Sequence, residues 1–431
     1  MTTQQEFKQT EIGRIPKEWD VVRLGEIAEV VSGFGFPIKY QGNKDGKYPF
    51  IKVNDLNLAP KYISYSENFI DDTILETLKV KICPPNTIIF PKIGMSTYLN
   101  KFRILKIWGT FDNNVAGLIS KNEIEPEFLF YYLLEKIDLK RLAGQTAAPS
   151  IRKSTLEAIT IALPPLPEQK KIAEILSTVD KAIEKVDEAI EKTERLKKGL
   201  MQELLTGRRN TVDGRQGRRE FKQTDTDIGR IPKEWEIKEL KEVVDINKES
   251  RDPTREFPDK QFFYIDIDSV ENGRGIVRNA KAMVGKEAPS RARRLIHYND
   301  VIMSMVRPYL KAFAIVPREY DNQICSTGFA VLTCKEKILP LYLLYTLFSK
   351  PVIEQCNKMM VGGQYPALNS SQVEKIKLPL PPLPEQKKIA EILSTVDKRL
   401  ELLRKRKEKL ERVKKGLMDD LLSGRIRVKV G

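Results

Sequence analysis

The sequence is poor in the residues that most enzymes use for catalysis and metal binding. Its 431 residues include one histidine, His297, and four scattered cysteines without a C-x-x-C pair, namely Cys83, Cys325, Cys334 and Cys356. This scarcity excludes the usual zinc sites and a disulfide scaffold. The phosphate loop G-x-x-x-x-G-K-[ST] does not occur, and neither does the Asn/Asp-Pro-Pro-aromatic tetrapeptide of amino-methyltransferases. We therefore predict no catalytic residues, no metal ligands and a structural or exposed His297.

Long apolar runs are lacking as well. No stretch approaches the roughly 20 apolar residues that span a bilayer, and residues 1–19 have no apolar signal region. We expect a cytoplasmic protein. With 41% hydrophobic and 31% charged residues, the composition is that of a globular chain of two or three domains. The 74 Lys and Arg exceed the 59 Asp and Glu by 15, which indicates either a nucleic-acid partner or a general basic bias.

What the chain does contain is an internal repeat. The segment LPPLPEQKKIAEILSTVD occupies residues 163–180 and recurs letter for letter at 380–397, which is 217 residues later. The same offset separates RLKKGLMQELLTGR from RVKKGLMDDLLSGR further along. Upstream, IGRIPKEW occurs twice and ends at Trp19 and at Trp235. Each half thus has an opening segment, a block that differs and a closing segment.

The two differing blocks predict one shared fold. They run over residues 20–162 and 236–379, so they are 143 and 144 residues long. Both alternate short β-branched or aromatic runs with Gly, Pro and Asn, which is typical of strands and turns, and both contain apolar helical stretches such as FLFYYLLEKI and LYLLYTLFSK. We predict an α+β fold with two similar mixed α/β domains, each a small sheet with flanking helices.

The closing segments predict two long helices. Apolar residues follow one another at steps of four and three, the spacing of a coiled-coil seam, and the second copy has Lys407 where the first has Ile190. The first helix is expected from Glu168 to Leu205, about 57 Å at about 1.5 Å per residue, and Gly207 and Gly424 end the two helices. The predicted seam comprises Ile172, Leu176, Val179, Ile183, Val186, Ile190, Ile389, Leu393, Val396, Leu400, Leu403 and Leu410.

Chain connectivity favours pairing of these helices within the chain. Only residues 208–220 join the first helix to the second opening segment, so the second helix should run back along the first as an antiparallel intramolecular coiled coil, with the blocks at opposite ends of a rod. Packing of each helix on its own block, or a homodimer, is the alternative. The expected domains are 1–162, a central helix at 163–207, a linker and second domain at 208–379, and a C-terminal helix at 380–431.

The arrangement indicates one task performed on two targets. Repeated helices and P-L-P-E-Q corners suggest two equivalent docking surfaces for another protein, whereas blocks that differ suggest two different ligands. On a basic protein, a split DNA sequence fits, with each block reading one half-site and the helices setting the spacing.

At these residues the sequence resembles a known family. IGRIPKEW followed by VVRLGEI, the strand PFIKVNDL and LPPLPEQKKIAEIL closing each half are similar to specificity subunits of Type I restriction-modification enzymes. The resemblance implies two target recognition domains that bind the two parts of a double-stranded DNA site. It further implies two modification (methyltransferase) subunits as partners, with restriction subunits joining through them. S-adenosylmethionine, ATP and magnesium would be bound only by those partners.

Candidate DNA contacts lie in parallel basic and aromatic loops. Arginine can bond guanine and glutamine can bond adenine, each through two hydrogen bonds. The candidates are Lys92, Tyr98, Lys101, Arg103 and Gln145 in the first block, and Arg291, Arg293, Arg294, Arg307, Tyr309, Lys311, Gln364 and Tyr365 in the second. Two other functions stay open at this point, a coiled-coil adaptor without sequence preference and a stand-alone DNA-modifying enzyme.

Overall fold

The computed structural model describes residues 6–144, 148–208, 221–222, 228–360, 363 and 366–428. It divides into two compact units, each holding one block and parts of both long helices. The first unit consists of Met1–Asp187 with Lys405–Gly431, and the second of Glu188–Arg404.

In the first unit, the block is built on a five-stranded sheet whose strand order is β4-β11-β8-β9-β6. Its centre is β8, whose Ile, Ile, Phe and Pro side chains are all buried. A second, three-stranded sheet has the order β10-β5-β7, with β5 and β10 parallel. The strands are β4 (Ala28–Ser32), β5 (Tyr48–Ile51), β6 (Tyr62–Ile63), β7 (Phe69–Ile70), β8 (Ile88–Pro91), β9 (Arg103–Leu105), β10 (Thr110–Phe111) and β11 (Val115–Ser120).

The second unit repeats this plan. Its four-stranded sheet, β16-β23-β20-β21, has the antiparallel pairings of β4-β11-β8-β9, and its other sheet, β18-β17-β22-β19, again contains a parallel pair, β17 with β22. The prediction of one fold for both blocks is confirmed. The strands are β16 (Val244–Ile246), β17 (Gln261–Ile265), β18 (Lys281–Val284), β19 (Ala292–Ile296), β20 (Val301–Ser304), β21 (Phe313–Ile315), β22 (Gln323–Ser326) and β23 (Phe329–Cys334).

Short strand pairs bring the two ends of each block together. In the first unit β3 (Asp20–Arg23) pairs with β12 (Thr160–Leu163), and in the second β15 (Glu236–Glu239) pairs with β24 (Lys377–Leu380). Two further hairpins form from β1 (Phe7–Thr10) and β2 (Gly13–Pro16), and from β13 (Phe221–Lys222) and β14 (Ile231–Pro232). Each block therefore ends beside its own start, where its long helix begins.

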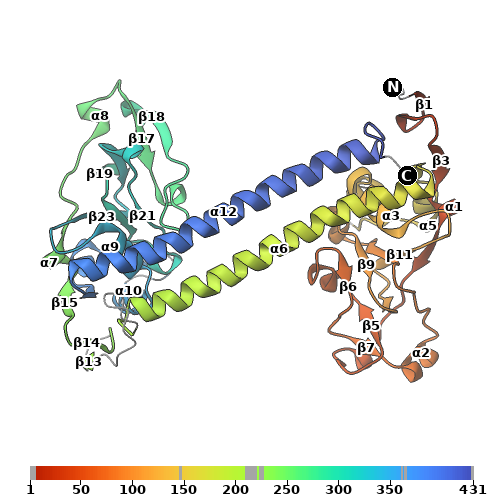
Figure 1. The fold of residues 1–431 in the computed structure, drawn as a ribbon, viewed down its shortest axis with the longest axis horizontal. Helices are drawn as coiled ribbons and strands as arrows, with labels where there is room; N and C mark the ends of the chain where they lie inside the picture. The colour runs from red at the N-terminus through yellow and green to blue at the C-terminus, as the bar shows by residue number, and fades with distance from the viewer. Residues whose placement is uncertain are drawn as a thin grey trace. The chain divides into compact units, whose positions relative to one another are not determined.

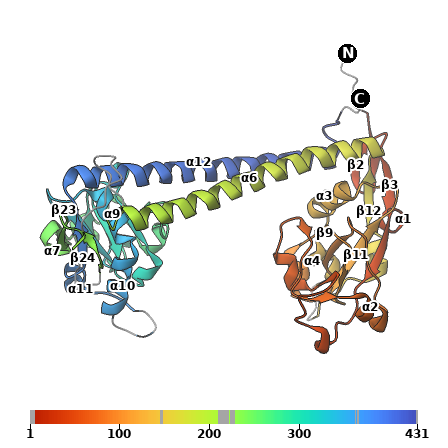
Figure 2. The same ribbon diagram turned by 60° about the horizontal axis from the view of Figure 1, so that its bottom comes forward.

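An apolar helix lies between the main sheet and the long helices of each unit. In the first unit it is α3 (Pro126–Lys136), whose six residues Phe128 to Leu133 are buried against strand residues and against Ile172 and Leu176 (Figure 2). Its equivalent is α9 (Pro340–Leu347). The shorter helices are α1 (Leu24–Ile27), α2 (Asp72–Leu78), α4 (Leu139–Ala143), α5 (Lys153–Glu157), α7 (Leu240–Val243), α8 (Pro253–Glu256), α10 (Lys350–Met359) and α11 (Ser370–Glu374).

The two long helices, α6 (Leu166–Leu204) and α12 (Leu383–Leu422), pair antiparallel in each unit (Figure 1). In the first unit Lys414 bonds Asp180 at 2.6 Å and Lys407 bonds Asp187 at 2.7 Å, so ascending numbers on one helix meet descending numbers on the other. In the second unit the same order links Arg404 to Glu194, at 2.6 Å. The prediction of an antiparallel intramolecular pair is confirmed. Lys407, the polar layer of the seam, turns its ammonium group to the partner helix.

The seam residues fall into two groups. Near each helix start, Ile172, Leu176, Ile389 and Leu393 are fully buried in the core of a block, beside the end of the other helix at Met418 to Leu422 or Leu204 to Leu205. Val186 and Leu400 are buried on the helices, and the other predicted seam residues are half-buried: Val179, Ile183, Ile190, Val396, Leu403 and Leu410. Charged residues surround them, and no helix within the described residues is long and apolar enough to cross a membrane.

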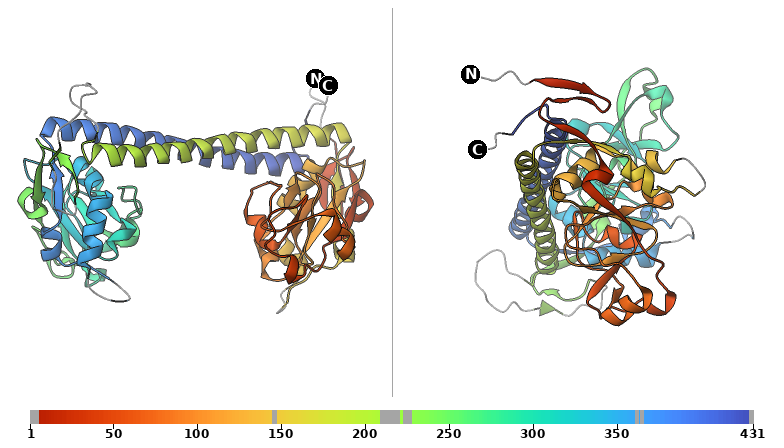
Figure 3. Two further views of the ribbon diagram at one scale, coloured as in Figure 1. Left: turned by 90° about the horizontal axis from the view of Figure 1, so that it is seen from below. Right: turned by 90° about the vertical axis from the view of Figure 1, so that its right-hand side faces the viewer.

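The repeated motifs form one corner in each unit. Trp19 is fully buried, donates its indole N–H to Glu168 at 3.1 Å, and lies beside Gly424 at the end of α12, where the left-handed backbone (φ +69) needs a residue without a side chain. Trp235 and Glu385 make the same bond at 2.9 Å, beside Gly207. The chain's opening segment and the end of α12 lie together in the first unit (Figure 3).

These corners explain why P-E-Q occurs twice. Gln169 accepts a hydrogen bond from the Glu125 backbone N–H and donates to two carbonyl oxygens, and Gln386 does the same around Leu339. The Glu and Gln side chains of both corners are at most 2% exposed. The expectation that the P-L-P-E-Q corners are docking surfaces is thus wrong for these four side chains, because their hydrogen-bonding groups are used within the chain.

Candidate nucleic-acid interface

The same loop interrupts the main sheet of both units. It connects β8 to β9 in the first and β20 to β21 in the second, and each loop contains a short 3-10 turn, Met95–Leu99 or Pro308–Leu310. Left-handed residues bound both turns: Gly94 (φ +79) and Asn100 (φ +47) in the first, Arg307 (φ +48) and Lys311 (φ +59) in the second. The two loops are bounded alike, but the turn has five residues in the first and three in the second, and the side chains differ.

A second segment lies beside each loop. The Gly94 backbone N–H donates to Pro149 at 2.8 Å, and the Arg307 N–H donates to Pro366 at 3.0 Å. The candidate residues Gln145, Gln364 and Tyr365 belong to these segments in sequence but lie outside the described residues.

In the first unit, two of the four remaining candidates are held within the block. The Lys92 ammonium donates to the Ser32 hydroxyl at 3.1 Å, and burial lowers its pKa. The Arg103 guanidinium donates to the Phe102 carbonyl at 2.6 Å, while its Nε is buried without a partner among the described residues, and burial lowers the pKa of this group too. Neither group is placed as an open surface cation.

Tyr98 and Lys101 lie on the outer part of the same loop. The Tyr98 hydroxyl donates to the Gly144 carbonyl at 3.4 Å, and the Lys140 ammonium lies 5.1 Å from its ring centre. The Lys101 ammonium donates to the Asn57 amide oxygen. Because Tyr98 lies between a lysine and the neighbouring segment, the loop presents an aromatic surface bordered by positive charge.

In the second unit, Tyr309 is 42% exposed at the tip of the turn, and Arg307 and Lys311 flank it. The Lys311 ammonium turns back and donates to the Phe348 carbonyl at 3.0 Å. Burial and the neighbouring positive charges of Lys197 and Lys198 lower its pKa. Tyr309 is the candidate that this loop presents outward, whereas Arg307 is half-buried with its Nε enclosed and Lys311 points toward the helices.

The three arginines at the start of β19 have different environments. Arg293 bonds Asp252 at 3.4 Å and the Ala292 carbonyl at 2.8 Å, so its charge is compensated within the block. Arg294 has a buried Nε without a partner among the described residues, next to an irregularity in the strand register. Arg291, just before the strand, is exposed. Of the three, Arg291 is the one whose side chain is open to a ligand.

Apolar side chains beside the candidates escaped the sequence analysis. Met95 is 65% exposed and Leu99 60% exposed on either side of Tyr98, and Trp108 is 53% exposed in the loop after β9. The sequence analysis did not single them out, because exposure of an apolar residue has no local sequence signal. In the structure they extend the surface on which a base or sugar could pack.

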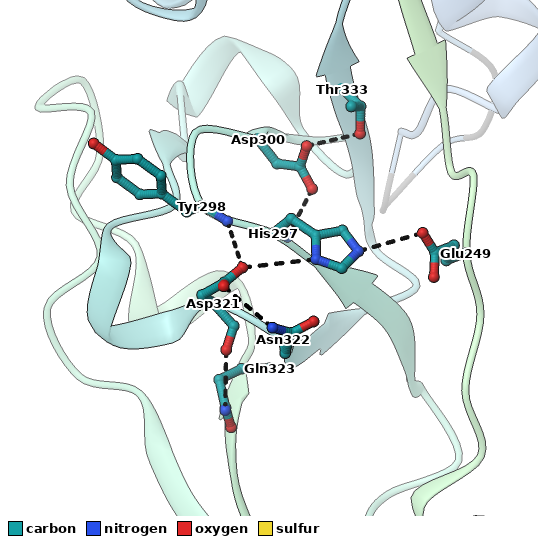
Figure 4. A network of polar contacts seen from close by, with 8 residues as sticks. All are labelled: Glu249, His297, Tyr298, Asp300, Asp321, Asn322, Gln323 and Thr333. Carbon is teal, nitrogen blue, oxygen red and sulfur yellow. Dashed lines mark hydrogen bonds and ion pairs between the residues drawn. The ribbon is translucent and has the colours of Figure 1, made fainter.

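The single histidine has a structural setting (Figure 4). His297 lies between Glu249, 3.3 Å from Nε2, and Asp321, 3.6 Å from Nδ1. Its backbone N–H donates to Asp300 at 2.8 Å, and the other Asp300 oxygen accepts from Thr333 at 2.7 Å. The network holds the turn between β19 and β20, which agrees with the structural role expected for His297.

The thiols are equally poor nucleophiles. Burial raises the pKa of Cys83 to about 11 and those of Cys334 and Cys356 to about 12, and it raises that of Cys325 still further. A thiol protonated at neutral pH neither attacks a substrate nor binds a metal readily. Across the described residues, no three His, Cys, Asp or Glu side chains are placed to hold a metal ion.

The two units share one fold, contain paired long helices and carry basic and aromatic loops. This combination is that of a two-domain DNA-recognition protein. The chain matches the model of the Type I restriction modification DNA specificity domain over residues 16–194 and again over 232–412. It therefore belongs to the family of Type I restriction-modification DNA specificity proteins.

Individual relatives agree along the whole length. The specificity subunit of the Type I restriction enzyme MjaVIII of Methanocaldococcus jannaschii is 30% identical over 99% of this chain and 97% of its own. That of EcoDI from Escherichia coli is 23% identical over 88% and 81%. Among solved structures, the S subunit of a Type I system from M. genitalium covers 97% of this chain and 99% of its own, with a TM-score of 0.57 at 17% identity, which supports the fold.

Proposed function

We propose that this chain recognises a split double-stranded DNA sequence, with one block reading each half-site, and performs no chemistry itself. One observation carries the proposal: both units present the same loop between the same strands, with left-handed residues at the same two positions and different side chains around them. Loops that start and end alike but differ in length and side chains are what two readers of different base sequences require.

Within each loop the side chains would divide the work. Lys101 in the first unit and Arg291 in the second would contact phosphates, which orients the duplex and makes the affinity salt-dependent. Arg307, together with the glutamines outside the described residues, would read base edges. Tyr98 and Tyr309 would pack against a sugar or base. Lys92, Arg103, Arg293 and Arg294 would act by shaping the loops rather than by direct contact.

Catalysis would then belong to partner proteins. We place two modification (methyltransferase) subunits on the repeated helices, one per unit, and restriction subunits joining through them, in the cytoplasm. S-adenosylmethionine, ATP and magnesium would be bound by those subunits. The buried thiols and the structural histidine support the absence of chemistry in this chain. One solved relative is described as showing the complex assembly and conformational transition of a Type I system, which supports such partners here.

The decisive experiment exchanges residues 20–162 for the equivalent block of a relative and maps base-specific protection on DNA with the assembled complex. We expect two protected patches separated by an unread spacer, and a change of sequence in only one of them. A single continuous patch, or a change in both halves after the exchange, would contradict the proposal.

A further inference from the structure

A groove of about 1360 Å³ opens within the second unit, between the end of α6, the first half of α12, and α9. Small-molecule sites usually enclose about 300–1,000 Å³. The groove is larger and open on one side, so its size suits a segment of a macromolecule better than a metabolite.

The fold does not require this groove, because the first unit fills the same place. Gly275 and Lys61 occupy equivalent positions: the carbonyl oxygen of Gly275 accepts from Ile315 at 3.3 Å on β21, and that of Lys61 accepts from Ile104 at 2.8 Å on β9. Lys61 extends a buried side chain across the gap, with its ammonium 2.9 Å from the Glu127 carboxylate. Gly275 (φ +78) offers no side chain to cross the gap, and a Cβ atom there would overlap Leu344 on the floor of the groove.

The helix that borders the groove also differs from its equivalent in the first unit. Glu127 is the second residue of α3, and the second residue of α9 is Leu341, which lines the groove. The ion pair that closes the first unit is thus replaced by a glycine and an apolar residue. Two coordinated changes at one place indicate a site that is kept open.

The lining combines an apolar floor with a cationic rim. Leu341, Leu344 and Phe348 form the floor, and ten Lys and Arg residues lie along the lining with three acidic ones. Two of the acidic residues are paired within the lining, Asp397 with Lys197 at 2.5 Å and Glu194 with Arg404 at 2.6 Å, so the other cations are in excess. Lys197 and Lys198 stand on α6 opposite Lys311, close enough that their charges lower its pKa. The groove therefore favours a ligand that is negatively charged and apolar at once.

We propose that this groove binds an acidic amphipathic segment of a partner protein, with leucine-like side chains on the Leu341, Leu344 and Phe348 floor and carboxylates at the lysines of the rim. A DNA duplex presents a polar, convex backbone that would leave this floor uncovered. The chain's own residues 209–227 hold five Lys and Arg against four acidic residues, so their net charge does not complement the rim.

This site has a function other than DNA recognition, and it occurs once per chain. The repeated helices offer their surface twice per chain, whereas the groove exists in the second unit and is filled in the first. It therefore binds one partner copy per chain, and its occupant distinguishes the two units of the molecule.

The test uses the full chain and a fluorescent, 15-residue helical peptide with Leu on one face and Glu on the other, followed by anisotropy. We expect one peptide per chain. Lys198→Glu should weaken binding by roughly tenfold or more, since it reverses a charge at the rim. Lys311→Asn should weaken it too, and this change preserves the backbone because Asn100 holds the same left-handed position in the first unit.

Lys415→Glu is the matched control, because Lys415 lies 217 residues after Lys198 in the other copy of the repeat, where Lys61 fills the gap. It should leave peptide binding unchanged. Equal weakening by the control, equal affinity for a peptide with Gln in place of Glu, two peptides per chain, or displacement of the peptide by a DNA duplex at equal concentration would each overturn the proposal. Circular dichroism of every variant verifies that a loss of binding is not a loss of folding.

Discussion

At the scale of single residues, Arg307 is the most informative position. Its backbone lies in the left-handed region (φ +48), which a side chain makes unfavourable, and the first unit has glycine at the equivalent position. A strained arginine where the fold accepts glycine agrees with the proposal that this side chain contacts DNA.

The corresponding prediction is that Arg307→Gly separates stability from DNA binding. The free energy of unfolding should stay within about 1 kcal/mol of the parent value, since relief of strain offsets the greater freedom of glycine in the unfolded chain. The affinity of the assembled complex for its DNA should fall by roughly tenfold or more. Calorimetry and anisotropy measure the two effects. Arg255→Ala, at a position where the side chain is 87% exposed, is the control and should alter neither.

A second residue-scale prediction compares two buried tyrosines. Tyr131 donates to Asp180 at 2.5 Å and accepts from the buried ammonium of Lys61 at 2.9 Å, whereas Tyr345 only donates, to Asp397 at 2.8 Å. Tyr131→Phe should therefore cost about 2–3 kcal/mol of unfolding free energy and Tyr345→Phe about 1–2 kcal/mol. Thermal unfolding of both variants gives the comparison. Equal losses would mean that the bond from Lys61 contributes nothing.

The sequence allowed some residues to be placed and not others. The repeat identified equivalent loops, so Tyr98 and Tyr309 were found as a pair. It could not show that the Lys92, Arg103 and Lys311 side chains turn inward, because the direction of a loop side chain depends on partners distant in sequence, such as Ser32 and Phe348. The exposure of Met95 and Trp108 was missed for the same reason.

At the scale of elements, the long helices contain glycine in two different settings, inside the helix and at its end. Gly199 and Gly416 lie inside α6 and α12 and, among the described residues, face open space where a Cβ atom would lie. Gly207 and Gly424 instead end these helices in left-handed conformations against the rings of Pro232 or Pro16. The same residue type is thus dispensable in one place and required in the other.

We expect Gly199→Ala to stabilise the second unit by about 0.5–1 kcal/mol, because alanine is the better helix former. Gly207→Ala should destabilise it by about 2 kcal/mol or more, because the new methyl group would overlap the Pro232 ring and the backbone conformation would be strained. Urea denaturation of the full chain measures both. Destabilisation by Gly199→Ala would show that the outer face of α6 is less open than described.

The elements themselves were predictable because their signals are local and repeated. The heptad spacing and the flanking Pro and Gly predicted helices over nearly the observed spans of α6 and α12. The role of the P-E-Q motif was not predictable, because Glu168 and Gln169 bond Trp19 and residues near 125, more than forty positions away. The exact repetition of the P-E-Q motif indicated a shared role for the two segments, but it could not indicate which residues they contact.

At the scale of the whole molecule, the net charge is distributed unevenly. Residues 380–431 contain 15 Lys and Arg against 8 Asp and Glu, while residues 163–205 contain 8 against 9. Of the excess of 15, seven charges thus belong to the second closing segment and six to the two blocks, and only the charges that touch phosphate contribute to the salt dependence of DNA binding.

We predict that the triple change of Arg406, Lys409 and Arg412 to Gln alters DNA affinity by less than about threefold, although it removes three exposed positive charges. In the same salt titration, Arg307→Gly should reduce the slope of log affinity against log salt by about 1, the value for one lost phosphate contact, if Arg307 also meets the backbone, and leave it unchanged if it meets bases alone. A large effect of the triple change would move part of the DNA interface onto α12.

The division of the chain into units also sets an order of events during synthesis. The second unit is one continuous segment, Glu188–Arg404, but the first needs Lys405–Gly431 to complete it, including Gly424 beside Trp19 and Arg427 on Glu168. At roughly 5–20 residues per second, the ribosome makes the intervening segment in about 10–40 s. The block that emerges first is therefore the last to be finished, because Trp19 and Glu168 wait for the final residues of the chain to cover them.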